Sequence, residues 1–146
     1  MKLSIGSDHA GFEYKEAIRE MLSHDGHDVH DVGTYSSERV DYPDYAVKVA
    51  QSVAKNDAEF GILICGSGIG VAITANKIAG VRAATCVSND MAHLARAHNN
   101  ANVVCIGERL ISLFEAKEIV RTFLIAPFEH GRHEERVKKI EELTGR

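Results

Sequence analysis

A thiol and a glycine-rich turn lie next to each other near the middle of this sequence. The stretch "LICGSGIGVA", residues 63–72, places Cys65 directly before three glycines at alternate positions. Glycines let the backbone fold so that successive N–H groups face one concavity at the start of a helix, where the helix dipole also attracts negative charge. The stretch therefore predicts an anion-binding turn, although glycines at these positions would also let a strand and a helix pack closely.

The turn does not match the loops that bind nucleotides. No Gly-Lys-Ser/Thr follows it, which excludes a P-loop. The spacing G-x-G-x-G also falls one residue short of the dinucleotide fingerprint G-x-G-x-x-G. The glycines alone therefore do not identify a ligand.

Cys65 has two candidate roles. A thiol at the start of a helix and beside convergent N–H groups is deprotonated more easily, so Cys65 could act as a base or a nucleophile. It could also be a small buried hydrophobic residue, the role that we expect for Cys86 and Cys105 within later strands. The three cysteines are scattered and form no C-x-x-C pair, so neither a disulfide framework nor a zinc site is indicated.

Three closely spaced histidines raise the question of a metal site elsewhere in the chain. They are His24, His27 and His30, and Gly26 interrupts the turn between them. Their side chains are therefore not expected to converge on one ion. We predict that they are surface residues, and we expect no metal site.

Three arginines are candidates for binding a phosphate group. Arg132 and Arg136 are four residues apart and so share one face of a predicted helix, an arrangement that could clamp a dianion from one side. Arg109 follows the last predicted strand. Each arginine could instead pair with a neighbouring acidic residue on a solvated face. The acidic candidates are Glu108, Glu134 and Glu135.

His98 and Asn99 lie in "AHNNAN", at the end of another predicted helix. A histidine in this position could transfer a proton at neutral pH, or it could simply cap the helix. The spacing alone does not decide between the two roles.

The candidate residues are spread over an α/β pattern. Short runs rich in Val and Ile alternate with longer amphipathic stretches, as in βα repeats around a parallel sheet. Strands are predicted at residues 2–7, 28–32, 60–65, 82–87 and 103–107. Helices are predicted at residues 11–24, 43–56, 69–78, 90–98, 110–124 and 131–143. Pro43 suits a first helical turn, and Pro127 ends the fifth helix.

In an open parallel sheet, ligands bind beyond the carboxyl ends of the strands. The segments that follow four predicted strands are "SDHAG", "CGSGIG", "SND" and "GERL". These segments hold much of the polar chemistry of the chain. We therefore expect it at one edge of the sheet.

Length and composition limit the other function classes. With 146 residues and no linker-like segment, the chain is expected to form a single domain over residues 1–146. The net charge of −4 gives no broad basic surface for nucleic acid. No apolar stretch is long enough to span a membrane, and the N-terminus becomes polar too early for a signal peptide, so a cytoplasmic protein is expected. The charged C-terminal helix could pack on its own domain or reach a partner.

Longer blocks of the sequence resemble the ribose-5-phosphate isomerases of type B, which share a family with the subunits of galactose-6-phosphate isomerase. The blocks are "GSDHAGFEYK", "YSSERVDYPDYA", "GILICGSGIGVAITANKIAGVRAA", "HNNANVVCIGER" and "GRHEERV", and together they span nearly the whole chain. The resemblance implies a Rossmann-like three-layer αβα sandwich with a five-stranded parallel sheet and an extra C-terminal helix. It also implies a homodimer, often paired into a homotetramer, with active sites at the subunit interface and no metal or organic cofactor.

Carried over residue by residue, the resemblance implies that Cys65 is the base that moves a proton between C1 and C2 of the sugar and that His98 is the acid that helps to open the furanose ring. Backbone N–H groups of the turn would hold the enediolate oxygen. The turn consists of Gly66, Ser67, Gly68, Ile69 and Gly70. The other implied substrate-binding residues are Asp8, His9 and Asn99 on the sugar side and Arg109, Arg132 and Arg136 on the phosphate side. Tyr42 is a further candidate contact for a sugar hydroxyl. Some relatives carry a glutamate base just after the last glycine; Val71 stands there in this sequence, which leaves the proton transfer to Cys65.

The expected reaction is the interconversion of ribose 5-phosphate and ribulose 5-phosphate through a cis-enediolate. A six-carbon substrate such as allose 6-phosphate or galactose 6-phosphate remains an alternative, because residue types do not measure the depth of a pocket. A galactose enzyme of paired subunits usually includes a partner without the cysteine, so Cys65 favours a self-sufficient enzyme. A non-catalytic sensor of sugar phosphates would need the phosphate clamp but neither Cys65 nor His98.

Overall fold

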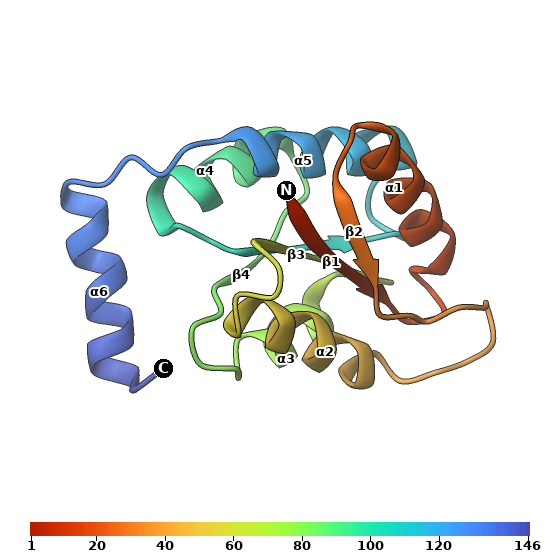
Figure 1. Ribbon diagram of the computed structural model, residues 1–146, viewed down its shortest axis with the longest axis horizontal. Coiled ribbons are helices and arrows are strands. Elements are labelled where there is room, and N and C mark those ends of the chain that lie inside the picture. The colour runs from red at the N-terminus through yellow and green to blue at the C-terminus, as the bar shows by residue number, and fades with distance from the viewer.

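The computed structural model describes residues 1–146 as an α/β sandwich (Figure 1). All five strands are parallel, in the order β2-β1-β3-β5-β4. The strands are β1 (Lys2–Ser7), β2 (Asp28–Asp31), β3 (Phe60–Cys65), β4 (Ala83–Thr85) and β5 (Val103–Gly107). The helices are α1 (Phe12–His24), α2 (Tyr42–Ala54), α3 (Ile69–Ala75), α4 (Asn89–Asn99), α5 (Leu113–Ile125) and α6 (Arg132–Thr144).

The sheet is covered on both faces, which makes three layers. One core cluster joins the sheet to α1, α4 and α5, with Ile18, Ala92 and Phe123 fully buried in it. The other joins the sheet to α2 and α3, with Val49 and Val71 fully buried. Figure 1 shows these two helical layers above and below the strands. The predicted fold class, a three-layer α/β sandwich with a five-stranded parallel sheet, is confirmed. None of the six helices combines the length and the apolar character that a membrane span requires.

Most elements differ from their predicted bounds by one to three residues; α5, for example, begins at Leu113 instead of residue 110. One side-chain interaction lies between the end of α3 and the start of β4. The helix α3 stops at Ala75 instead of residue 78, and β4 covers only residues 83–85 instead of 82–87. The Asn76 amide donates to the carbonyl of Ala83 (2.9 Å) and accepts from its N–H (2.8 Å). A side chain therefore takes the place of a neighbouring strand along the outer edge of β4. Local periodicity does not report such a long-range contact.

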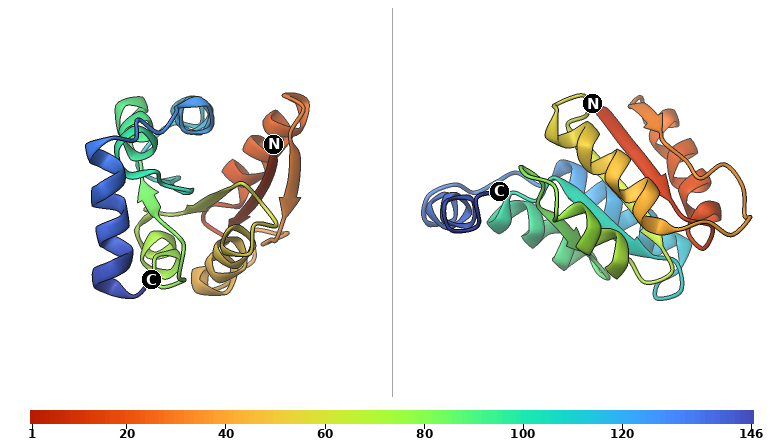
Figure 2. Two further views of the ribbon diagram at one scale, coloured as in Figure 1. Left: turned by 60° about the vertical axis from the view of Figure 1, so that its left-hand side comes forward. Right: turned by 90° about the horizontal axis from the view of Figure 1, so that it is seen from below.

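The last helix stands apart from the sandwich. In Figures 1 and 2, α6 lies outside the three layers, next to α4 and the edge formed by β4. Arg82 Nη1 pairs with Glu141 across this gap (2.8 Å), and a cleft of about 860 Å³ remains between α6 and the domain. Ile140 and Leu143 of α6 stay exposed. The helix thus buries little of its apolar stripe against its own chain.

A fully buried lysine joins α1 to the end of β2. Lys15 Nζ contacts Asp31 Oδ2 (2.5 Å) and Glu16 Oε1 (2.6 Å), and it lies 5.5 Å from the centre of the Phe12 ring. Asp31 also accepts the N–H of Gly33 through Oδ1 (2.9 Å). The pair therefore fixes the point at which the chain leaves β2 for the long loop before α2.

We expect Lys15→Ala to lower the free energy of unfolding by about 3 kcal/mol, because it leaves the half-buried Asp31 carboxylate without its main partner. Urea unfolding followed by circular dichroism measures this change. Lys48→Ala removes an exposed lysine and serves as the control, with an expected change of about 0.5 kcal/mol or less. A loss for Lys15→Ala no larger than that of the control would show that the buried pair adds nothing to stability.

Candidate active site

The thiol of Cys65 faces the turn that follows β3. Its Sγ accepts the backbone N–H of Gly68 at 3.1 Å, and hydrogen bonds of this kind stabilise a thiolate. Gly68 has φ of 75°, and a Cβ at this position would lie 2.9 Å from the carbonyl carbon of Ile106. Only glycine suits this backbone and this close approach to β5. The turn is therefore shaped by its contact with the neighbouring strand as well as by its own sequence.

The turn also presents free backbone donors. The N–H groups of Gly66, Ser67 and Gly70 have no hydrogen-bond acceptor within the chain. The N–H of Ile69 donates instead to the hydroxyl of Ser67 (3.2 Å), so it differs from the free donor that the sequence predicts at this position. A set of fixed, unpaired donors beside a thiol can stabilise a developing oxyanion.

A cleft of about 370 Å³ opens at this turn. The predicted site residues that line it are the base Cys65, the phosphate-side Arg109, and Asp8, His9, Tyr42, Gly66, Ser67 and Gly70. The Tyr42 ring covers Gly70, because a Cβ there would lie 2.6 Å from Tyr42 Cζ. The Arg109 guanidinium covers Gly66 in the same way, at 3.0 Å from the Cβ position. Both side chains pack on glycines of the turn, where any Cβ would displace them.

The loop after β1 brings two more polar side chains to the cleft. Asp8 Oδ1 accepts the N–H of Gly11 (3.1 Å), and a Cβ on Gly11 would lie 2.5 Å from the carbonyl oxygen of Ile64. The His9 ring contacts the backbone of Val40, with Nδ1 3.2 Å from its nitrogen and 3.1 Å from its oxygen. Gly11 thus lies close against β3, and His9 joins this loop to the loop before α2; both Asp8 and His9 line the cleft at the carboxyl edge of the sheet.

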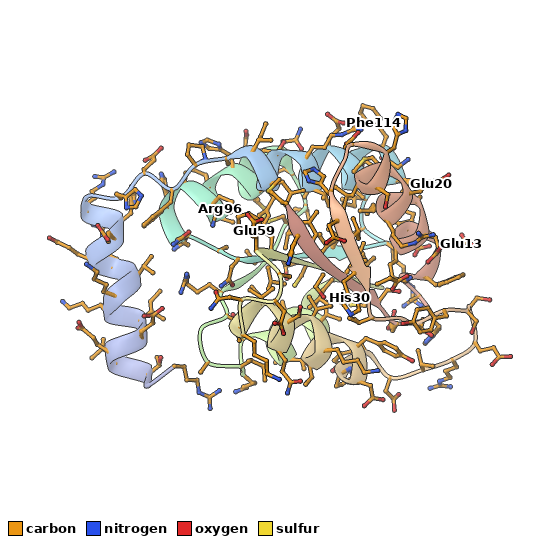
Figure 3. All side chains as sticks on the ribbon, viewed as in Figure 1. Glu13, Glu20, His30, Glu59, Arg96 and Phe114 are labelled. Carbon is orange, nitrogen blue, oxygen red and sulfur yellow. The ribbon has the colours of Figure 1, made fainter.

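Arg109 is not neutralised by its neighbour in the sequence. It forms no ion pair within 4.0 Å, so the alternative pairing with Glu108 is not observed. Burial, and then the negative charge of Glu13 on α1 (Figure 3), raise the pKa of Glu108. A carboxyl group in this setting competes weakly for a cation, which leaves the guanidinium of Arg109 available to a ligand.

The other predicted residues lie at the opposite edge of the sheet. The helix α4 starts beyond the carboxyl end of β4 and is about 16 Å long, so it carries His98 and Asn99 back to the amino edge. The carbonyl of Asn102, three residues further on, accepts the N–H of Gly61 at the start of β3 (2.9 Å). Neither His98 nor Asn99 lines the cleft at Cys65.

Arg96 fixes the end of α4 on which His98 lies. Its Nη1 donates to the side chain of Asn100 and to the carbonyl of Ala101, both at 2.8 Å. Its guanidinium stacks 4.6 Å from the centre of the Phe60 ring, and Figure 3 shows it projecting inward from α4. The position of His98 is thus set by packing in the core.

Three side chains meet at this amino edge. The rings of His98 and His133 are stacked, with centres 4.2 Å apart and planes at 7°. Glu129 Oε2 lies 3.7 Å from His98 Nε2 and 3.6 Å from His133 Nε2. The ligand atoms lie within 4.8 Å of one another, as in a metal site. A metal ion lies near the plane of each ring that binds it, and two parallel stacked rings do not direct their lone pairs at one point.

No local pattern in the sequence predicts that Glu129 and His133 contact His98. They lie more than thirty positions from His98 along the chain, and only the docking of α6 onto α4 brings the three together. Arg132 and Arg136 lie on the same helix and form no ion pair with Glu134 or Glu135, since Glu134 contacts His130 and Lys138 instead. Both guanidinium groups remain available to an anion.

The remaining cysteines and histidines take structural or surface positions. Cys86 lies one residue beyond β4 and not within it, and Cys105 lies in the middle of β5; both are fully buried. Burial raises the pKa of Cys86 to about 11 and also raises the pKa of Cys105. The histidines at positions 24, 27 and 30 are at least partly exposed and form no ligand cluster.

Comparison with known proteins identifies the family. A model of the Ribose/Galactose Isomerase family matches residues 3–140. The chain is 47% identical to ribose-5-phosphate isomerase B of Escherichia coli K12, over 99% of this chain and 97% of that protein. It superimposes on ribose-5-phosphate isomerase B of Clostridium thermocellum with a TM-score of 0.98 and 47% identity, covering 99% and 98% of the two chains. For the Mycoplasma genitalium enzyme with bound ribulose-5-phosphate, the TM-score is 0.95 and the identity 46%, with 99% and 96% covered. The chain that carries this thiol, glycine turn and sandwich therefore belongs to the ribose/galactose isomerase family.

Proposed function

We propose that this chain interconverts ribose 5-phosphate and ribulose 5-phosphate, with Cys65 as the base. The observation that carries the proposal is the cleft in which the Cys65 thiol lies beside unpaired backbone donors and the unpaired cation of Arg109. The relative with bound ribulose-5-phosphate, which aligns over 99% of this chain, supports the choice of substrate.

The residues of the cleft suit an enediolate mechanism. The thiolate takes the proton from C2 of the open aldose, and the carbonyl oxygen at C1 becomes the enediolate oxygen. The thiol then returns a proton to C1 as the carbonyl forms at C2, and the hydroxyl proton of C2 passes to the oxygen at C1. The free N–H groups of Gly66, Ser67 and Gly70 would stabilise the charge on oxygen as it develops.

His98 would act before this step. In the closed furanose, the ring oxygen must gain a proton as its bond to C1 breaks, while the C1 hydroxyl loses its proton to water. An imidazolium can supply the first proton near neutral pH. Asn99, Arg132 and Arg136 lie at the same edge as His98 and would bind the sugar and its phosphate.

We infer that the complete site forms between two chains of a homodimer. Within one chain, the Cys65 cleft lies at the carboxyl edge of the sheet, while His98 and the arginines of α6 lie at the amino edge. No side-chain rotation spans a sheet, so one substrate can meet both sets only if they come from different chains. The weak packing of α6 on its own domain and its exposed Ile140 and Leu143 support this arrangement. Pairing of such dimers into a homotetramer remains a further proposal.

A six-carbon sugar phosphate is the second candidate substrate, because the residues that line the cleft do not by themselves fix the length of the sugar. A sensor without catalysis would have no use for a thiol beside free donors. Assays of the purified protein with ribose 5-phosphate, ribulose 5-phosphate, allose 6-phosphate and galactose 6-phosphate distinguish these candidates directly.

We expect turnover with the five-carbon pair to exceed turnover with either six-carbon sugar in these assays. Cys65→Ala should reduce turnover by at least about a thousandfold while substrate binding, measured by calorimetry, survives. The base would be lost, but the backbone donors and the arginines would stay. Activity of Cys65→Ala within about tenfold of the parent would exclude Cys65 as the base.

The three thiols should differ in reactivity. At pH 8, iodoacetamide should label Cys65 alone, because Cys65 lines the cleft. Burial raises the pKa of Cys86 to about 11 and also raises the pKa of Cys105, so both should stay protonated at pH 8. Mass spectrometry of peptides locates the label. All three cysteines should react after unfolding in guanidinium chloride, which is the control. Labelling of Cys86 or Cys105 in the folded protein at the rate of Cys65 would contradict this assignment.

A mixture of two inactive variants tests the shared site. Cys65→Ala and Arg136→Ala chains, mixed in equal amounts and allowed to exchange subunits, should recover about a quarter of parental activity. Random pairing makes about half of the dimers mixed, and each mixed dimer has one site with both residues intact. Native mass spectrometry verifies the exchange. If exchange is complete and no activity returns, Cys65 and Arg136 do not serve one site from opposite chains.

A further inference from the structure

Glu129 and His133 contact His98 from a different part of the chain. Glu129 belongs to the linker before α6, and its N–H donates to the carbonyl of Ala97 (3.0 Å), next to His98. The His133 side chain is only 9% exposed, whereas that of His98 is 39% exposed. The linker is thus fixed to the end of α4, and the buried ring of His133 forms a flat support under the more open ring of His98.

The charges around the stack favour one location for a proton. Two imidazolium rings at 4.2 Å would repel each other, so the stack holds at most one positive charge near neutral pH. Burial lowers the pKa of His133, and the neighbouring His98, Arg132 and Arg136 lower it further, against the opposing effect of Glu129. His133 is therefore the ring that is harder to protonate, and the more open ring of His98 lies next to the Glu129 carboxylate.

We propose that Glu129 and His133 are positioning residues for His98. The His133 ring fixes the plane of the His98 ring, and the Glu129 carboxylate, 3.7 Å from Nε2, stabilises its protonated form. The charged groups that face this pair are Glu129 from the linker and Arg132 and Arg136 from α6; the arginines oppose the carboxylate. Through these contacts, Glu129 and His133 would set the rate at which His98 opens the sugar ring. The proposal rests on the role of His98 proposed above.

Two measurements separate ring opening from the later proton transfer. Consumption of ribose 5-phosphate requires the ring to open. Exchange of the C1 proton of ribulose 5-phosphate with deuterium from D2O requires only the base and the enediolate, because this ketose has no furanose to open. A variant that impairs His98 alone should slow the first measurement and leave the second unchanged.

We expect Glu129→Gln to slow single-turnover consumption of ribose 5-phosphate by about tenfold at pH 8, with C1 exchange within about twofold of the parent. Without the carboxylate, the charged form of His98 is less stable, so the high-pH limb of the consumption profile should move to lower pH by about half a unit. Glu134→Gln is the matched control, since it makes the same change nearby, in the first turn of α6, beside His130 and Lys138. It should leave both rates and the profile unchanged.

His133 provides the second pair of variants. His133→Phe keeps a flat ring under His98 and should retain most of the consumption rate, whereas His133→Ala removes the ring and should lose about tenfold. Equal losses of consumption and C1 exchange in Glu129→Gln or His133→Ala would show a general structural defect and would overturn the proposal. Unchanged consumption in both variants would overturn it as well.

An NMR titration of the histidine rings separates this proposal from the proposed function. His98 should protonate at lower pH in Glu129→Gln than in the parent, whether or not the protein turns over either sugar. If the parent chain is inactive with all four sugars, the isomerase assignment is refuted. The NMR titration of His98 in the parent and in Glu129→Gln can still be measured and compared. A His98 titration that is identical in the parent and in Glu129→Gln refutes the positioning role of Glu129.

Discussion

The right-handed crossover between parallel strands is the constraint on which the site depends. Each strand ends at the carboxyl edge of the sheet, and the helix that follows returns the chain to the amino edge. Cys65 is the last residue of β3 and lies at the carboxyl edge. His98 is the penultimate residue of α4 and lies at the amino edge. The separation of base and acid therefore follows from connectivity alone, and it makes a second chain a requirement of the proposed mechanism.

The carboxyl edge is built by backbone approaching backbone. Gly11 packs on the carbonyl of Ile64, Gly68 packs on Ile106, and a Cβ on Gly107 would lie 2.6 Å from the backbone of Ser67. These close approaches hold the turn rigidly while leaving three of its N–H groups without an acceptor. Rigid and unpaired donors need no reorganisation when charge develops on a bound oxygen, which is why a turn of this kind suits an enediolate better than a flexible loop would.

The sequence predicts the elements of this fold well because each carries a local signal. The alternation of apolar runs and amphipathic stretches places every strand and helix within a few residues. The segments after β1, β3 and β5 line one cleft as predicted, whereas Ser88 of the segment after β4 caps α4 and does not line it. Local signals fail where a long-range contact decides the outcome. The side chain of Asn76 ends α3 by pairing with Ala83, and Glu129 and His133 reach His98 only through the docking of α6.

The helix α6 joins these observations. A helix whose apolar residues Ile140 and Leu143 remain exposed gains little from its own domain, yet its first turn is fixed to α4 by the stacked histidines and by the linker at Ala97. The first turn, with Arg132 and Arg136 near it, is thus packed against α4. The C-terminal half is joined to the domain by polar contacts such as that between Arg82 and Glu141, and it leaves apolar surface unburied. A helix that is anchored beside the proposed acid and open to a partner can bring acid and phosphate clamp together as one unit. The free energy of dimer formation would then also complete the site, so that binding of the second chain and assembly of the catalytic residues are the same event.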